Sequence, residues 1–445
     1  MLVLYQATAF LSMVAFTNYP LNIMAESGMY GNPTTVSTIY TIGYLIGIVL
    51  QLIMTGFIGK IKSIKKLGVI LGILTLVFAL GIMLIPPTML VLWLIIFCIE
   101  CVVSSTYCTF SIGILVGQWF PTRKGTVMGV TTIAFPIGNA VIGLFASSFF
   151  GKFVANIATV GPEMSARNAG LVSFIPFYLI VLAGLIIGII FIKDYPEQCG
   201  AYRDNDKNLT PEIANQMMLE EIENKKTTVW HLKNTLKSRD FWFVTIPMGL
   251  LLMFAVGMMT QTNAIINAFG LGDSYQLIMM GIAAMGVIGS WALGVLDTKL
   301  GTRTAIIIST ILMAVSGFVG MIRVPACLII SLALLGLFMG ASSNFTVSAA
   351  AQYWRREDFP SVFAAVNPIA NIFNAAGPMV ITMLLGNTVD AESLNTVTMF
   401  LVIGIAGIVA TALMFLFKPA HVKEVDDIYR KAAGKPLDDV LVGRK

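Results

Sequence analysis

Apolar segments of roughly 20 residues recur along the whole chain. A helix needs about 20 mostly apolar residues to cross roughly 30 Å of hydrocarbon, so each segment has the length of a membrane span. Hydrophobic residues make up 57% of the 445 residues and charged residues 11%, whereas soluble domains carry about a quarter charged residues. The sequence therefore predicts an all-α integral membrane protein.

Twelve transmembrane helices are predicted, in two groups of six. The first group covers residues 2–24, 34–59, 67–86, 89–117, 125–151 and 170–193. The second group covers residues 241–268, 275–296, 304–323, 325–353, 359–386 and 396–418. One long polar segment, dense in both signs of charge, separates the two groups.

Lysine and arginine are distributed unevenly between the two sides of the predicted membrane. If the loops alternate sides, all but three of the 28 Lys and Arg residues share the side of the termini and the polar segment; the exceptions are Lys152, Arg167 and Arg323. Positive residues near helix ends are retained in the cytoplasm. We therefore expect a multi-pass protein of the cell (cytoplasmic) membrane with both termini cytoplasmic. The net charge of +5 follows from this rule and indicates no nucleic-acid partner.

The predicted organisation has four parts: an N-terminal six-helix half at 1–193, a cytoplasmic linker loop at 194–240, a C-terminal six-helix half at 241–418 and a cytoplasmic tail at 419–445. Within the linker, "TPEIANQMMLEEIENKK" begins with Thr210 as a helix N-cap and Pro211 at the first helical position. A short helix is expected there.

Three short stretches recur at a nearly constant offset between the halves. "GFIGKIKSIKKLG" is matched 238 residues later by "GVLDTKLGTRTA", "GQWFPTRKGTVMG" 234 residues later by "AQYWRREDFPSVF", and "PIGN" 232 residues later by "PIAN". Two halves of the same topology form a parallel repeat, which in transporters places the solute site between the halves near the membrane midplane.

The twelve-span plan, the central loop and the motif "GVLDTKLGTRT" resemble the major facilitator superfamily, whose signature reads G-x-x-x-D-x-x-G-x-[RK]. The resemblance implies that Asp297, Gly301 and Arg303 gate the cytoplasmic side. Asp297 stands one residue early, and the first half has Gly59 or Lys60 where an aspartate is usual. Gating is therefore expected to rest on Asp297.

Within the superfamily, "GQWFPTRKGTVMG", "DYPEQCGAY" and "LKNTLKSRDFWFV" resemble the oxalate/formate antiporter and monocarboxylate transporter branch. That branch moves small carboxylates and usually keeps a basic residue in a late helix. Here the seventh, eighth, tenth and eleventh spans contain no internal Lys or Arg, which argues against a dicarboxylate because a desolvated anion needs a cation or a ring of donors. Drug/proton antiporters usually carry G-P-x-x-G-G in their fifth helix, whereas this chain reads "AFPIGNAVIG". Drug efflux is therefore the second choice.

One carboxylate interrupts the apolar stretch "LIIFCIECVVSSTYCTF". Glu100 lies 11 residues into its span, roughly 16 Å deep, and is the only charged residue predicted in the core of any span. A proton can occupy such a carboxyl because desolvation opposes its charge, so Glu100 is the candidate proton-coupling residue. The alternative is a structural hydrogen bond to a neighbouring helix. Its helical stripe reads Trp93, Phe97, Glu100, Ser104, Tyr107 and Ser111.

The resemblance implies that the first, fourth, seventh and tenth spans line the cavity. Their polar residues, all neutral, are the substrate-binding candidates: Tyr5, Thr8, Ser12, Ser104, Tyr107, Thr260, Gln261, Asn263, Asn267, Asn344 and Ser348. They suit a neutral polar solute, or a carboxylate that crosses with a proton. Singly, each is also expected as a cross-helix hydrogen bond worth about 0.6 kcal/mol. Asn367, Asn371 and Asn374 share one face of their span and are predicted to pack against a neighbour.

Other function classes fit the sequence less well. The spans hold no nucleophile with a nearby base and no phosphate-binding loop, so an enzyme is not expected. Cys98, Cys101 and Cys108 have no histidine in any span to complete a metal site, and no cofactor is predicted. A channel fits the hydropathy but not the repeat.

The sequence thus predicts a secondary active transporter of a small organic solute, monocarboxylate-like or a polar metabolite, that works by alternating access with proton coupling. The alternatives are drug efflux by proton antiport and anion exchange without protons. The expected partners are the solute, protons and the lipid bilayer, and the chain is expected to act as a monomer.

Overall fold

The computed structural model describes residues 1–18, 20, 33–55, 61, 63–120, 124–134, 136–138, 162–203, 206, 210–226, 228–355, 357–386 and 394–435. Within these ranges the chain is helical and contains no strand. Eight of the described helices are long and apolar enough to cross a membrane, and shorter apolar helices accompany them at Leu2–Thr17, Thr38–Met54, Thr126–Gly138 and Ile175–Phe191. The all-α membrane fold predicted from hydropathy is confirmed.

Helices of the first half follow the predicted spans closely. They are α1 (Leu2–Met13) with the π-helix η1 (Val14–Asn18), α2 (Pro33–Thr55), α3 (Ile64–Leu84), α4 (Leu90–Ser105) with the π-helix η5 (Thr106–Ser111) and α5 (Ile112–Trp119), α6 (Lys124–Thr132), and α9 (Pro162–Phe191). Residues 139–161, within and after the fifth predicted span, lie outside the described residues, as do Gly59 and Lys60.

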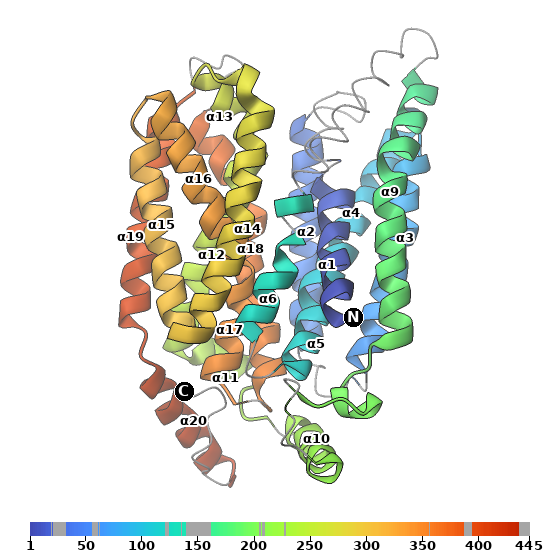
Figure 1. Cartoon of the computed structure of the whole chain (residues 1–445), viewed down its shortest axis with the longest axis vertical. Helices are drawn as coiled ribbons and strands as arrows, with labels where there is room; N and C mark the ends of the chain where they lie inside the picture. The colour runs from blue at the N-terminus through green and yellow to red at the C-terminus, as the bar shows by residue number, and fades with distance from the viewer. Residues whose placement is uncertain are drawn as a thin grey trace.

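Helices of the second half repeat this order. They are α12 (Arg239–Thr260) with α13 (Thr262–Ala268), α14 (Tyr275–Leu300), α15 (Thr302–Gly320), α16 (Pro325–Ser342) with α17 (Asn344–Tyr353), α18 (Phe359–Leu385) and α19 (Thr396–Leu416). Figure 1 shows the two sets of helices side by side, with α6 and α14 at the boundary between them.

Interruptions occur in the first, fourth, seventh and tenth spans. The first and fourth spans change to π-helix at Val14 and Thr106, and the seventh and tenth are broken at Gln261 and Ser343. These four spans are related to one another by their place in the repeat. Broken helices and π-turns leave backbone groups available and are common at functional sites.

Polar helices gather at one end of the bundle, which we call the linker end (Figure 1). Helix α10 (Pro211–Lys226) confirms the helix predicted in the linker. Two further helices were not predicted: α11 (Leu232–Lys237) and α20 (Pro419–Ala432). Helix α20 buries Val422, Asp426 and Arg430, which share one face because they are four residues apart.

The buried face of α20 is held by ion pairs and hydrogen bonds. Arg430 Nη2 lies 2.9 Å from Asp358 Oδ2, and Arg355 Nε lies 2.9 Å from Asp426 Oδ2. Trp230 Nε1, from the end of the linker, donates to Asp426 Oδ1 at 2.8 Å. We call these five residues the tail clasp. The clasp fixes both the linker and the tail to the loop between α17 and α18.

Direct contacts join the two halves at the linker end. The Thr126 backbone N–H, in the first turn of α6, donates to Thr298 Oγ1 of α14 at 3.1 Å, and the two hydroxyls lie 2.8 Å apart. Further along the same helices, Ser290 Oγ donates to the Gly129 carbonyl at 2.8 Å and lies 2.7 Å from Thr132 Oγ1. The structure is therefore closed between α6 and α14.

Candidate functional site

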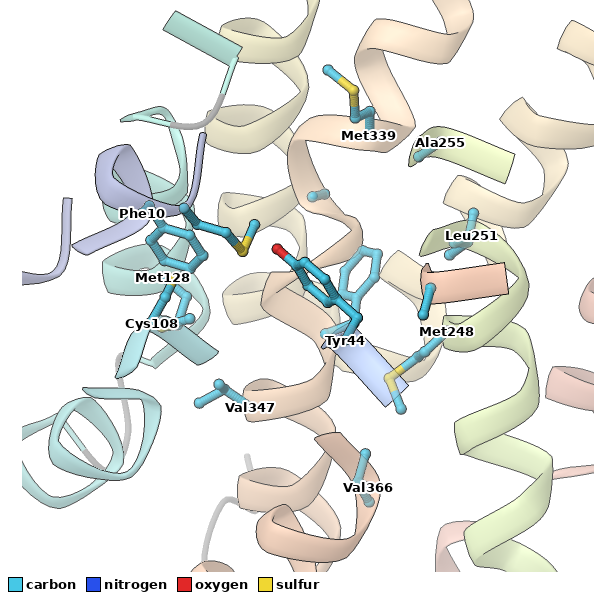
Figure 2. Close-up of a cluster of buried hydrophobic side chains, with 14 of the residues drawn as sticks. Phe10, Tyr44, Cys108, Met128, Met248, Leu251, Ala255, Met339, Val347 and Val366 are labelled. Atoms are coloured by element: carbon cyan, nitrogen blue, oxygen red, sulfur yellow. The ribbon is translucent and has the colours of Figure 1, made fainter. Parts of the chain in front are cut away.

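A cavity lies between the two halves. It encloses about 760 Å³, including the solvent at its mouth, and is lined by α1, α2, η5, α5 and α6 on one side and by α12, α16, α17 and α18 on the other. Figure 2 shows apolar side chains of this region, with Phe10, Cys108 and Met128 in the first half and Met339 and Ala255 in the second.

The floor of the cavity is closed by aromatic rings of α18. Gly113 lines the cavity on α5, and a Cβ atom there would stand 2.8 Å from Phe363 Cζ. One turn closer to the linker end, a Cβ at Gly117 would stand 2.1 Å from Phe359 Cε1. Only glycine allows the rings to come this close, so the two halves meet below the cavity.

The polar lining of the cavity consists of amides and hydroxyls, and each described lining residue is uncharged. The first half contributes Gln6 from α1 and Tyr40 from α2. The second half contributes more polar groups: Ser342, Ser343, Thr346, Asn367, Asn371 and Asn374.

Three asparagines of α18 form a hydrogen-bonded ladder along the cavity wall. Asn371 Nδ2 donates to the backbone carbonyl of Asn367 at 2.9 Å, and Asn374 Nδ2 donates to Asn371 Oδ1 at 3.2 Å. Thr346 Oγ1 of α17 lies 3.5 Å from Asn367 Oδ1. The sequence showed that these residues share a face, but we expected that face to pack against a helix rather than to line the cavity.

The predicted candidates on α1 lie on another face of the helix than the cavity-lining residues. Thr8 Oγ1 donates to the Tyr5 carbonyl at 2.8 Å, and Ser12 Oγ donates to the Ala9 carbonyl at 2.7 Å. The Tyr5 ring meets the Tyr107 ring edge-on, with centroids 6.0 Å apart. These side chains point into the first half, whereas Gln6, on the adjoining face, lines the cavity.

The predicted candidates on the seventh span gather beyond the cavity, around the break at Gln261. Gln261 Nε2 donates to Thr382 Oγ1 of α18 at 2.9 Å, and Asn267 Nδ2 donates to Asn263 Oδ1 at 3.3 Å. Thr260 Oγ1 donates to the Gly257 carbonyl at 2.8 Å. None of them is among the described residues that line the cavity.

The predicted candidates on the tenth span, Asn344 and Ser348, are buried on α17 and do not line the described cavity. Neither polar atom of the Asn344 side chain has a hydrogen-bond partner among the described residues. The same helix places Thr346 and Val347 on the cavity wall, so the candidates and the lining residues alternate around α17.

Glu100 is fully buried inside the first half. Its stripe on α4 faces α3 and α1, because Trp93 Nε1 donates to the Ile82 carbonyl of α3 at 3.2 Å and Tyr107 packs against Tyr5. Ser104, predicted as a binding residue, is buried on this stripe. Neither carboxyl oxygen of Glu100 has a hydrogen-bond partner in the described part of the chain, and the residue does not line the described cavity. Ser111 completes the predicted stripe, but its side chain lies outside the described residues.

The predicted gating residues lie at the linker end of α14 and α15. Asp297 Oδ1 accepts from Thr302 Oγ1 at 2.5 Å, and Gly301 adopts a φ of 86°, a conformation that favours glycine. Arg303 Nε donates to the Met414 carbonyl at 3.1 Å, at the end of α19. All these contacts are within the second half. The residue that reaches the first half is Thr298, next to Asp297.

Solved structures with this fold are transporters. A proton:xylose symporter bound to 6-bromo-6-deoxy-D-glucose aligns with a TM-score of 0.70 and 11% identity, over 96% of this chain and 98% of that one. The E. coli fucose:proton symporter gives a TM-score of 0.65 and 13% identity, over 94% and 98%. A human organic anion transporter gives 0.61 and 13%, over 93% and 98%. At these identities the likeness shows the fold alone.

Sequence comparison identifies the family. No curated protein matches the chain. The sequence profile of the Major Facilitator Superfamily matches residues 1–306 and 265–441, which together cover nearly the whole chain. The chain therefore belongs to the Major Facilitator Superfamily.

Proposed function

We propose that the chain is a proton-linked secondary transporter of a small organic solute, a monocarboxylate-like compound or a polar metabolite. The observation that carries this proposal is the cavity between the halves, which is lined by uncharged side chains and closed at the linker end. In the proposed orientation the linker end is cytoplasmic, with both termini on that side. The solute then binds from the opposite side, and the halves rock about the cavity as a monomer.

The interrupted spans support alternating access. Gln6, Cys108 and Ser343 line the cavity from three of the four broken spans, and Cys108 lies in the π-helix itself. A π-turn or a break absorbs a change in backbone angles at low cost, since its hydrogen bonds are already irregular. We therefore propose that these breaks act as hinges for the rocking motion.

Proton coupling is assigned to Glu100. Burial opposes the charged form of a carboxyl that lacks a counter-ion, so the group binds a proton readily. Because Glu100 faces the interior of the first half, its proton acts on the packing of α4 against α1 and α3 rather than on the solute directly. Cys108 lies on the same span as Glu100, about 12 Å further along the helix axis, and lines the cavity. A change in the packing of this span can therefore reach the cavity wall.

The test uses proteoliposomes that contain a pH-sensitive dye. Monocarboxylates, dicarboxylates, sugars and amino acids are offered in turn to the wild type, to Glu100→Gln and to Glu220→Gln, whose carboxylate is exposed on α10. We expect one solute class to drive proton entry in the wild type and in Glu220→Gln. Glu100→Gln should lose proton entry, by at least about tenfold, and retain solute counterflow. Equal proton entry in wild type and Glu100→Gln would refute the assignment.

Drug efflux by proton antiport is the second candidate. The aromatic and thioether groups of Phe10, Met13, Met128 and Met339 on the cavity wall favour it, since they suit an amphipathic solute. In the same liposomes an antiporter would release protons from the lumen when solute enters. Anion exchange without protons would show solute counterflow and no dye response.

A further inference from the structure

We infer that the solute is an uncharged molecule with at least two hydrogen-bond donors, held between the side-chain carbonyl of Gln6 in the first half and that of Asn374 in the second. This inference rests on the proposed transport function and specifies its substrate class. The hydrogen bonds of the cavity-lining amides fix how each amide is oriented, and two amide oxygens then have no partner among the described residues.

The orientation of the Asn374 amide is fixed by the asparagine ladder. A backbone carbonyl only accepts hydrogen bonds, so the side-chain atom of Asn371 that lies 2.9 Å from the Asn367 carbonyl must be its N–H donor. The Oδ1 atom of Asn371 therefore faces Asn374, whose Nδ2 donates to it at 3.2 Å. The atom left over is Asn374 Oδ1, which is buried and has no partner among the described residues.

The Gln6 amide is in a similar position on the opposite side. Gln6 is fully buried, and its Nε2 lies 3.3 Å from Met128 Sδ, which is also a cavity-lining residue. A thioether sulfur is a weak acceptor and not a donor, so the nitrogen rather than the oxygen belongs there. Gln6 Oε1 is left without a partner in the described part of the chain.

An unsatisfied buried carbonyl is costly, so each of these oxygens selects a ligand that donates. Leaving a buried acceptor unpaired is unfavourable, and a hydroxyl or N–H of the solute recovers that cost. A carboxylate would place negative oxygens against two carbonyl oxygens, in a cavity whose described lining holds no cation. The chemistry therefore favours a polyol, a sugar or an amide over an organic anion. Because the two acceptors belong to different halves, the solute also links the halves.

Ligand-induced stabilisation of the purified full-length protein tests this inference without reference to proton movement. The melting temperature is measured with xylitol, a hexose, acetamide, lactate and pyruvate, because a ligand that binds only the folded state raises it. The variants are Gln6→Leu, Asn374→Leu and the double substitution. Gln118→Leu is the matched control, since Gln118 is also buried with an unpartnered Oε1 but lies outside the cavity.

We expect a neutral donor-rich compound to stabilise the wild type and the Gln118→Leu variant. Gln6→Leu and Asn374→Leu should each weaken its binding about tenfold, as expected for the loss of one well-formed hydrogen bond. Stabilisation by lactate or pyruvate and by none of the neutral compounds would overturn the inference, as would unchanged binding in the double variant. A third outcome separates the two proposals. If a neutral solute binds and its binding depends on both amides, but no proton entry occurs in the proteoliposomes, the proton coupling is rejected and the proposed substrate class stands.

Discussion

Glu100 and Asp358 are both fully buried carboxyl groups, but their surroundings differ. Asp358 accepts hydrogen bonds from Thr228 Oγ1 at 2.5 Å and from Arg430 Nη2 at 2.9 Å, and these donors offset part of the cost of burying its charge. Glu100 has no such partner among the described residues. Asp358 therefore holds elements together at the linker end, whereas a carboxyl with no counter-ion is suited to take up and release a proton.

The clasp aspartate should make stability depend on pH. Burial raises the pKa of Asp358 from 3.8 to about 6, although Thr228 and Arg430 oppose the rise; Glu357 and Asp426 add to it. A raised carboxyl pKa contributes stability that is present below about pH 4 and lost as pH rises through about 6. The free energy of unfolding of the wild type should therefore fall by up to about 3 kcal/mol across this pH range. The Asp358→Asn variant should not show this fall. The check is the melting temperature of wild type and variant from pH 4 to 8; identical profiles would contradict it.

The sequence predicted the buried charged residue within a span but not which polar residues line the described cavity. Glu100 could be recognised as buried because it interrupts an otherwise apolar run. Thr8 and Ser12 were chosen for their polarity, yet a hydroxyl on a helix can satisfy itself on a carbonyl three or four residues back, and both do so. An amide such as Gln6 has two donors and an acceptor and needs partners beyond its own turn. Being an amide was not a sufficient signal either, because Gln261 and Asn344 do not line the described cavity.

At the level of helices, α6 and α14 pack closely across the boundary between the halves. A Cβ atom at Gly129 would stand 2.7 Å from the Ser290 carbonyl oxygen, and one at Gly286 would stand 2.8 Å from Pro136 Cβ. Small residues let helix backbones approach closely in a membrane, where packing replaces the hydrophobic effect as the driving force. The contact is thus sensitive to a single added methyl group.

Gly129→Ala should favour the state that is open at the linker end. The added methyl overpacks the contact at a cost of about 1–3 kcal/mol, roughly a tenfold shift in population. The measurement is the rate at which an impermeant maleimide labels Thr132→Cys, in a Cys199→Ser background, from the linker end. We expect about tenfold faster labelling with Gly129→Ala. Gly281→Ala on the same α14 is the control, because its Cβ would have no neighbour within 4 Å; equal rates for both would refute the prediction.

Hydropathy predicted the long apolar helices and missed the short polar helices at the linker end. The linker helix α10 was recognisable from its N-terminal residues, Thr210 and Pro211. Helix α20 is short and amphipathic, and the partners of its buried Asp426 become apparent only in the structure, because Trp230 and Arg355 are distant in sequence. The breaks at Gln261 and Ser343 were also missed, since neither residue is a helix breaker and the break depends on how neighbouring helices pack.

For the whole molecule, the contacts at the linker end correspond to one of the two states that the proposed alternating access requires. In that proposal the contact between α6 and α14 is lost when the cavity opens to the linker end, whereas contacts inside each half persist. Thr126 and Thr298 cross the boundary, with hydroxyls 2.8 Å apart. Thr310 and Thr411 have the same 2.8 Å separation but join α15 to α19 within the second half.

Disulfides at these two threonine pairs should therefore have different effects. Oxidation of a Thr126→Cys, Thr298→Cys variant should arrest transport by at least about tenfold, because a cross-link at this distance holds the halves closed. Reduction should restore it. The Thr310→Cys, Thr411→Cys variant should keep transporting when oxidised. Solute uptake into proteoliposomes before and after reduction is the measurement, and full transport by the oxidised first pair would contradict alternating access at this boundary.

The tail clasp also sets an order of events during synthesis. Trp230 and its acceptor Asp426 are 196 residues apart, so the indole N–H of Trp230 has no acceptor in the clasp until the last helix has emerged. At about 5–20 residues per second, translation of that interval takes roughly 10–40 s. Throughout that time the first half can assemble before the clasp is complete. Ribosome-bound chains that stop before α20 should therefore lack the hydrogen bond between Trp230 and Asp426, and only a chain that includes α20 completes the clasp.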